Sequence, residues 1–239
     1  MYEKQSYSHS TKTMIGYSMR LILRTLWEHH GAPKLDKHVP RYGRVHPRNV
    51  TATREEIDAI LGAAKDSLRL WLLLCSDLAI RSGTANRLNG DNYDPHSGIL
   101  RFTSKHHSAQ TMPVTDEIKR LLAPLDHHAR TPYVWQLRAA ERTIGGHNVS
   151  SMKRQQLDRD FKAVRLSVGI TRRITPHDLR RTTAVAVLEH TRDIRVVKDL
   201  LGHSDLKNTL WYIDHDLNPV TRSMLELVKS PNWRKERTA

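Results

Sequence analysis

Apolar residues recur at helical spacing in several separate stretches of the chain. The first stretch, 13–30, has its apolar side chains at Ile15, Met19, Ile22, Leu23 and Leu26. This spacing predicts an amphipathic helix, and Gly31 is suited to end it. The polar residues 1–10 before it are expected to be irregular. The basic segment 31–49 after it contains three prolines and predicts an extended linker.

A second helical pattern opens the predicted main domain. Thr53 and Glu56 have the spacing of a capping box, in which two side chains bond the amides of the first turn. An apolar stripe follows at Ile57, Ile60, Leu61 and Ala64. The apolar run within 67–77 predicts a buried helix, and a turn at 78–83 leads into a short helix ending near Leu88.

Short apolar runs bounded by turn residues predict two strands, 99–103 and 111–114, joined by an exposed loop. Helices are predicted directly after Thr115 and at 157–168. Residues 126–150 are polar and show no clear periodicity. The chain is therefore predicted to be mainly α with a small antiparallel β-sheet, an α+β fold.

Two predicted helices near the C-terminal end carry the most distinctive polar residues. Thr175 is suited to cap the first helix. His177 and Arg180 are three residues apart on that helix, so they share a face. The second helix, 193–201, stops at Gly202, a residue suited to a left-handed C-cap.

Composition adds a strong positive charge to this pattern. The 239 residues include 39 Lys and Arg against 25 Asp and Glu, which gives a formal net charge of +14. A chain this basic usually binds a polyanion, and nucleic acid is the first candidate. The alternative is a basic surface that serves solubility alone.

Cysteine usage and hydropathy indicate the compartment. Cys75 is the only cysteine, so the chain cannot form an internal disulfide or a cysteine-rich zinc site, which fits a reducing compartment. The longest apolar run, 70–75, is too short to span a bilayer. The N-terminus has no apolar signal region. We therefore expect a cytoplasmic protein that does not bind membranes.

Familiar catalytic motifs are absent: there is no Gly-Lys phosphate loop, no Gly-x-Ser-x-Gly and no His-Glu-x-x-His. Adjacent histidine pairs lack a carboxylate at ligand spacing, so they are expected to be solvated surface residues and not a metal site. What remains is an anion site without a metal, supplied by Arg81, Lys105, His177, Arg180, His203 and Tyr212. Taken singly, each has an ordinary structural explanation, such as a surface cap or a core aromatic.

The order and spacing of these six residues resemble the active site of the tyrosine recombinase (phage integrase) family. That family has an arginine after a buried helix and a lysine on a β-hairpin. His-x-Leu-Arg, Leu-Gly-His and a tyrosine nine residues further on then follow. All six positions are occupied here in that order, within 74–212. The His-Asp-Leu-Arg and Leu-Gly-His elements are specific, whereas the arginine and lysine segments are weaker alone.

The resemblance implies a site-specific DNA recombinase or integrase that cleaves and rejoins strands through a 3′-phosphotyrosyl intermediate, in integration or excision of a mobile element. Tyr212 would be the nucleophile, His177 its base, and Lys105 the proton donor to the leaving 5′-oxygen. The charge on the phosphate oxygens would be met by Arg81, Arg180 and His203. No cofactor and no metal are implied, because two arginines and a lysine take the place of a metal.

The resemblance also implies double-stranded DNA as the partner and a homo-oligomer, from dimer to tetramer, assembled on it. It divides the chain into a shortened N-terminal core-binding helix with a basic linker, 1–48, and a catalytic domain, 49–239. The end of that domain, 214–239, is a tail with a predicted helix at 220–228. We expect this tail to pack either on its own domain or on a neighbouring protomer.

Two departures from the family pattern keep other functions open. Thr84 stands where the family often has a glutamate that supports the preceding arginine. The N-terminal region is also shorter than is usual in the family. One alternative is a DNA-binding protein of the same fold that has lost strand exchange. The other is a nicking topoisomerase, which shares the chemistry but needs no partner strand.

Overall fold

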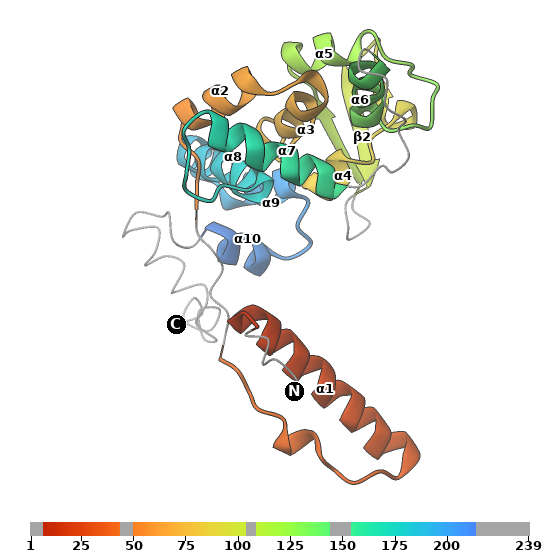
Figure 1. Ribbon diagram of the computed structural model, residues 1–239, viewed down its shortest axis with the longest axis vertical. Coiled ribbons are helices and arrows are strands. Elements are labelled where there is room, and N and C mark those ends of the chain that lie inside the picture. The colour runs from red at the N-terminus through yellow and green to blue at the C-terminus, as the bar shows by residue number, and fades with distance from the viewer. Residues whose placement is uncertain (1–6, 44–49, 104–108, 144–153, 214–239) are drawn as a thin grey trace, which may run out of the picture. The chain divides into compact units, whose positions relative to one another are not determined.

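The structure is a computed structural model that describes residues 7–43, 50–103, 109–143 and 154–213. The chain divides into two compact units, Met1–Arg48 and Asn49–Ala239, which are described separately (Figure 1). Lys105 and the helix predicted at 220–228 lie outside the described residues.

The first unit contains the long helix α1 (His9–His30) and a strap, residues 31–43, that includes one 3-10 turn, η1 (Asp36–His38). The helix begins earlier than the apolar pattern predicts, because Ser8 caps it. The Ser8 hydroxyl accepts a hydrogen bond from the amide of Thr11 at 3.2 Å. Gly31 ends the helix in the left-handed conformation, φ 64°, as predicted.

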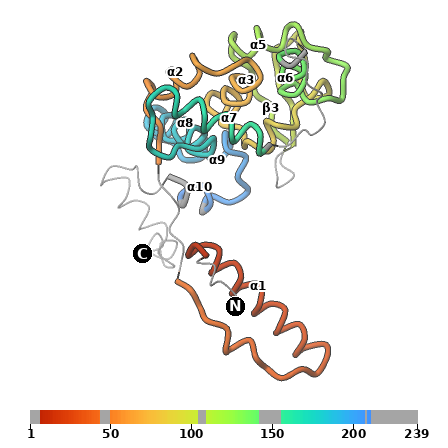
Figure 2. The backbone as a smooth tube through the Cα atoms, in the orientation of Figure 1, coloured from red at the N-terminus to blue at the C-terminus, as the bar shows by residue number. Residues whose placement is uncertain are grey.

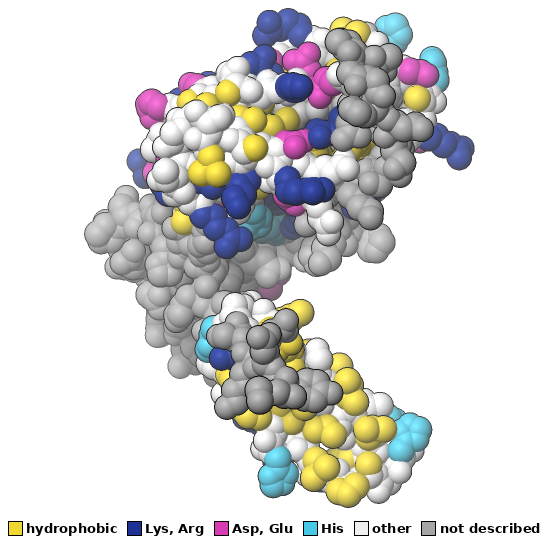
Figure 3. Space-filling view, in the orientation of Figure 1, with side chains coloured by type: hydrophobic (Ala, Val, Ile, Leu, Met, Phe, Trp, Pro, Cys, Tyr) yellow, Lys and Arg dark blue, Asp and Glu magenta, His cyan; other side chains and the backbone are white. Residues whose placement is uncertain are grey.

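Helix α1 and the strap approach each other closely at Gly16. A Cβ atom there would lie 3.2 Å from the carbonyl oxygen of Pro40, and Nη1 of Arg20 donates to that same oxygen at 2.7 Å. Much of the apolar surface of α1 remains exposed, as Figure 3 shows, including Met14, Tyr17 and Ile22. The strap therefore covers only one side of the helix.

The second unit consists mainly of helices, with one small sheet. The helices are α2 (Arg54–Ala63), α3 (Asp66–Ser76), α4 (Ser82–Ala85), η2 (Gly90–Asn92), α5 (Asp116–Leu122), α6 (Tyr133–Thr143), α7 (Arg154–Ser167), α8 (Pro176–Thr191), α9 (Ile194–Leu201) and α10 (Leu206–Ile213). The strands are β1 (Tyr93–Asp94), β2 (Ile99–Thr103) and β3 (Ala109–Pro113). These elements confirm the predicted mainly α fold with a small antiparallel sheet.

The sheet has the order β1-β2-β3, and each neighbouring pair is antiparallel. Leu100 lies opposite Met112, and Phe102 lies opposite Gln110. Leu100, Phe102 and Met112 are buried, because alternate residues of a strand point to the same face. Strand β1 escapes prediction because two residues are too few to show an alternating pattern.

Helix α3 forms the centre of the core. All of its residues from Ser67 to Ser76 are buried except Arg69, as expected for a helix that is apolar on every side. It packs against α5, α6 and α8, and Figures 1 and 2 show it between these helices. Nε1 of Trp71 donates to the carbonyl oxygen of Ser82 at 3.0 Å. This bond holds the turn that follows α3 against the core.

Helix α6 lies in the region without an assigned pattern. Tyr133, Val134 and Trp135 are consecutive and all buried, so the apolar residues do not follow the spacing of a one-sided helix. Nε1 of Trp135 donates to Oδ1 of Asn86 at 3.0 Å, which joins α6 to the end of α4. Contacts with distant parts of the chain, and not a local pattern, therefore stabilise this helix.

Candidate active site

Among the candidates whose side chains the structure describes, Arg180 on α8 is the best-buried charged residue, at 2 % exposure. Its Nη1 donates to the carbonyl oxygen of Ala79, and its Nη2 donates to the carbonyl oxygen of Leu201 at 2.7 Å. Ala79 lies two residues before Arg81, and Leu201 lies two residues before His203. One guanidinium group thus joins two turns that are far apart in the sequence.

The turn that carries Arg81 has an unusual backbone. Ala79 takes the left-handed conformation, φ 49°, which is uncommon for residues other than glycine. Arg81 follows at the N-cap position of α4. Its carbonyl oxygen accepts hydrogen bonds from the amides of Thr84 at 2.8 Å and of Ala85 at 2.9 Å. Thr84, which stands where a glutamate would support the preceding arginine, is buried. The bond from Arg180 helps to hold this turn.

The local sequence explains where α8 begins. The Thr175 side chain accepts a hydrogen bond from the amide of Asp178. The Asp178 carboxylate in turn accepts hydrogen bonds from the amide and from the hydroxyl of Thr175, both at 2.8 Å. This reciprocal pair is a capping box, and Pro176 fits the first turn. His177 therefore lies in the first turn of a helix, where the helix dipole disfavours a positive charge.

The pKa of His177 is lowered from its ordinary value. Removal of water by surrounding protein atoms is the main cause, followed by the positive charge of Arg180 and, more weakly, that of Arg81. Asp178 acts in the opposite direction. The residue keeps contact with solvent, so the neighbouring atoms crowd the ring without enclosing it. A lowered pKa favours the neutral imidazole at pH 7, the form that can accept a proton.

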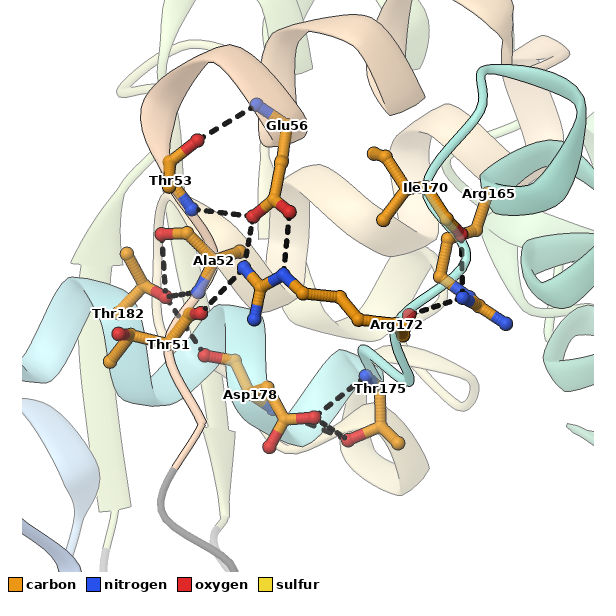
Figure 4. A network of polar contacts seen from close by, with 10 residues as sticks. All are labelled: Thr51, Ala52, Thr53, Glu56, Arg165, Ile170, Arg172, Thr175, Asp178 and Thr182. Atoms are coloured by element: carbon orange, nitrogen blue, oxygen red, sulfur yellow. Dashed lines mark hydrogen bonds and ion pairs between the residues drawn. The ribbon is translucent and has the colours of Figure 1, made fainter.

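A polar network braces the N-terminal end of α8 (Figure 4). Arg172, in the loop before the helix, donates from Nε to Oε1 of Glu56 at 2.7 Å and from Nη2 to Oε2 of the same carboxylate. Its Nη2 also donates to the carbonyl oxygen of Thr51 at 3.0 Å. On α8, the hydroxyl of Thr182 accepts the amide of Ala52 at 2.8 Å. The first described residues of the second unit therefore help to fix the helix that carries His177.

Helix α9 ends directly before His203. Gly202 is left-handed, φ 57°, and its amide donates to the carbonyl oxygen of Asp199 at 3.0 Å. The amide of His203 donates to the carbonyl oxygen of Lys198 at 3.0 Å, which completes a Schellman motif. Nδ1 of His203 lies 3.0 Å from Oγ1 of Thr209, a buried residue of α10. The turn thus fixes the backbone of His203, and the threonine fixes its ring.

Gln110 on β3 also contacts the end of α9, and sequence reasoning missed it. Its Nε2 donates to the carbonyl oxygens of Asp199 at 2.9 Å and of Leu200 at 3.3 Å. This contact places the β2–β3 hairpin beside the turn that precedes His203. The one signal available in the sequence is a polar residue opposite Phe102, on the face of the sheet that is otherwise apolar.

The side chains of two of the six candidates lie outside the described part of the structure. Lys105 lies in the loop between β2 and β3, outside the described residues, and Tyr212 belongs to α10, whose last side chains are also outside them. The described structure brings together the segments that carry Arg81, His177, Arg180 and His203.

The sequence pattern of the phage integrase family matches residues 51–218, which include all of these segments. The chain belongs to the phage integrase family of tyrosine recombinases. It is 30 % identical over 181 residues to the tyrosine recombinase XerC of Chlamydia muridarum (strain MoPn / Nigg), covering 75 % of this chain and 56 % of that protein. It is 29 % identical over 192 residues to the tyrosine recombinase XerD of Lacticaseibacillus casei, covering 75 % and 60 %. The chain thus spans little more than half the length of these relatives.

Solved structures of tyrosine recombinases have the same fold. A lambda integrase dimer bound to a COC′ core site matches with a TM-score of 0.61 and 17 % identity, over 87 % of this chain and 60 % of that one. The XerA recombinase matches with a TM-score of 0.55 and 19 % identity, over 95 % of this chain and 78 % of that one. At such low identity, these two structures support the fold and not the roles of individual residues.

Within the described ranges, no group of His, Cys, Asp and Glu side chains is placed to hold a metal ion. No described helix is long and apolar enough to cross a membrane. Burial raises the pKa of the Cys75 thiol to about 12, so it is not a competing nucleophile at neutral pH. The polar residues around Arg180 remain the candidate site of this integrase-family chain.

Proposed function

We propose that this chain is a site-specific DNA recombinase that cleaves and rejoins strands through a covalent 3′-phosphotyrosyl intermediate. The observation that carries the proposal is the guanidinium of Arg180, which links the turn before Arg81 to the turn before His203. His177 lies within the electrostatic influence of both arginines. Membership of the phage integrase family supports the same chemistry.

The first step is attack of the Tyr212 hydroxyl oxygen on a DNA phosphorus atom. A tyrosine has a pKa near 10 in water, so it needs a base at neutral pH, and His177 accepts the proton. A bond forms between phosphorus and the tyrosine oxygen while the bond from phosphorus to the 5′-oxygen breaks. Lys105 gives a proton to that leaving oxygen, which departs as a 5′-hydroxyl.

The negative charge that grows on the phosphate oxygens is met by Arg81, Arg180 and His203. A guanidinium carries five N–H donors, more than any other side chain. Its forked geometry also suits a phosphate better than a lysine would. Because Arg180 is 2 % exposed, we expect the side chains over it to shift when DNA binds.

The second step reverses the first with a different strand. The 5′-hydroxyl of a partner strand attacks the phosphotyrosyl phosphorus, its proton passes back through the same groups, and Tyr212 is released. One phosphodiester bond is formed for each one broken, so no ATP is needed. The outcome is the exchange of strands between two DNA sites, as in integration or excision of a mobile element.

We propose double-stranded DNA as the partner, bound by a dimer to tetramer of the chain. The net charge of +14 supports this, and Figure 3 shows Lys and Arg side chains spread over the visible face of the second unit. Residues 49–239 would form the catalytic domain. Residues 1–48 would act as a shortened core-binding helix with a basic linker, and 214–239 as a tail that packs in cis or in trans.

The test is covalent trapping on a nicked DNA substrate whose cleaved fragment diffuses away. The wild-type chain should form a tyrosine-linked adduct, which denaturing electrophoresis detects and peptide mapping assigns to Tyr212. Tyr212→Phe should form none, because the nucleophilic oxygen is missing. An adduct in the phenylalanine variant would show that another residue attacks the phosphate.

The same substrate separates the alternatives. A wild-type chain that binds the DNA but never forms an adduct would be a DNA-binding protein of this fold, and the recombinase proposal would be wrong. Adduct formation together with relaxation of supercoils, but without exchange of marked ends, would indicate a nicking topoisomerase. Exchange of marked ends between two duplexes is the result that the proposal requires.

A further inference from the structure

The C-terminal end of α9 needs hydrogen-bond donors from outside the helix. The last four carbonyl groups of any α-helix have no partner within it. Here the Schellman turn satisfies two of them: the amide of His203 donates to the carbonyl oxygen of Lys198, and the amide of Gly202 donates to that of Asp199. The carbonyl oxygens of Leu200 and Leu201 receive no hydrogen bond from the amides of this turn.

Two side chains from other elements donate hydrogen bonds to these remaining carbonyl oxygens. Nη2 of Arg180 donates to Leu201 at 2.7 Å, and Nε2 of Gln110 donates to Leu200 at 3.3 Å and to Asp199 at 2.9 Å. Gln110 is therefore the counterpart of Arg180 at the same helix end. Both are donors aimed at the negative end of the α9 dipole.

Gln110 also lies against the backbone of the glycine that precedes His203. A Cβ atom on Gly202 would lie 2.7 Å from both Cδ and Nε2 of Gln110. The amide group therefore packs directly on the Cα of Gly202, while its strand is paired to β2 through Phe102. The three atoms nearest to that Cβ position all belong to the side chain of Gln110.

We infer that Gln110 is a positioning residue for His203, which it holds in place through the carbonyl end of α9 and through Gly202. This inference rests on the proposed recombinase function. Its side-chain amide acts as a donor and couples the β2–β3 hairpin to the turn that presents the histidine. Loss of the donor lets that turn shift, and a shift of about 1 Å in a catalytic group can lower a rate by roughly 100-fold.

The informative substitution is Gln110→Glu, which keeps the shape but replaces the donor with an acceptor and adds a negative charge at a helix C-terminus. We expect the rate of adduct formation at saturating DNA to fall by about 10- to 100-fold. DNA affinity should stay within about twofold of wild type. The control is Gln155→Glu, the same chemical change at an exposed position of α7, which should cleave like wild type.

A second measurement does not depend on activity. Amide hydrogen exchange of Gly202 and His203 should become faster in Gln110→Glu, and the NMR signals of the His203 ring, which is bonded to Thr209, should move. If the glutamate variant does not fold, Gln110→Met provides the same readouts, because it removes the donor without adding charge. We expect Gln110→Met to cleave about 3- to 10-fold more slowly than wild type.

The outcomes separate the inference from the function on which it rests. A wild type without an adduct would sink the recombinase proposal, whereas the exchange and ring signals would still report on Gln110. Wild-type cleavage and unchanged Gly202 and His203 signals in the glutamate variant would overturn the inference alone. A defect confined to DNA affinity would also overturn it, since Gln110 would then contact DNA and not position His203.

Discussion

Replacement of Arg180 should destabilise the fold as well as stop the proposed DNA cleavage. In Arg180→Met the carbonyl oxygens of Ala79 and Leu201 lose their donors in a buried place. Each hydrogen bond from a charged donor contributes about 1.5–3 kcal/mol, and each buried acceptor left without a partner costs about 1–3 kcal/mol. The retained apolar volume of methionine limits cavity formation. We expect a loss of about 3–5 kcal/mol in the free energy of unfolding.

Arg180→Lys should fall between the wild type and Arg180→Met. A lysine ammonium group is a single point, so it can bond one of the two carbonyls but cannot span both as the fork of a guanidinium does. We expect a loss of about 1–3 kcal/mol. Charge is conserved, so the difference between the wild type and Arg180→Lys isolates the geometry of the fork from its charge.

Urea unfolding at pH 7, followed by circular dichroism, measures these losses as shifts of the midpoint. Thermal unfolding should agree, with a decrease in Tm of about 10 °C for Arg180→Met. The control is Arg195→Lys, where the arginine is 82 % exposed in its ion pair with Asp193. That change should cost no more than about 0.5 kcal/mol. An Arg180→Lys midpoint equal to that of wild type would refute the claim that the fork holds both turns.

Two further predictions concern titratable groups. In the free protein, the NMR titration of His177 should give a pKa below the ordinary histidine value near 6.5, and a value above it would contradict the described surroundings. The folded pKa lies below the unfolded one, so this histidine should cost stability as the pH falls from about 6.5 through the folded pKa. Glu56→Gln should cost about 1 kcal/mol at pH 7 through loss of the pair with Arg172, while a glutamine keeps the capping box. The Arg172 bond lowers the pKa of Glu56. The stability advantage of the wild type over Glu56→Gln should therefore be present above the unfolded pKa near 4.3 and disappear as acid protonates Glu56. If the urea midpoints of wild type and Glu56→Gln differed by the same amount at pH 7 and at pH 3, this prediction would be wrong.

Features that depend on near neighbours in the sequence were predictable. The capping boxes of Thr53 with Glu56 and of Thr175 with Asp178 both form, because each needs only residues three positions apart. Gly31 and Gly202 both end helices in the left-handed conformation, since glycine carries no Cβ to clash there. The paired strands β2 and β3 are present as well, although β3 starts at Ala109, earlier than its apolar pattern.

Features that depend on distant partners were not predictable from local pattern. Arg180 and His177 share a helix, yet Arg180 is buried and His177 is exposed, because Arg180 finds its carbonyl partner Ala79 across 101 positions of sequence. Gln110 reaches Asp199 across 89 positions. No periodicity within β3 could reveal this contact, since it depends on how the hairpin and α9 pack.

The family resemblance identified six candidate residues but not how the fold holds four of them. Order and spacing select Arg81, His177, Arg180 and His203 from the sequence. They do not show that backbone carbonyls before Arg81 and His203 both accept bonds from Arg180. That link requires the folded backbone, and it explains why an arginine at this position has a structural role in addition to any contact with DNA.

The lowered pKa of His177 also bears on how the proposed base would work. Positive charges at Arg180, Arg81 and Arg181 contribute to that lowering. A DNA phosphate bound between these groups would bring negative charge, so it should raise the pKa of His177 again. Linkage is reciprocal: protonation of His177 must then favour phosphate binding to the same degree. The base would therefore become stronger only when the substrate is in place, which is the state in which Tyr212 must lose its proton. A pKa from the pH dependence of cleavage at saturating DNA that is no higher than the NMR value of the free protein would show that the two charges are not coupled.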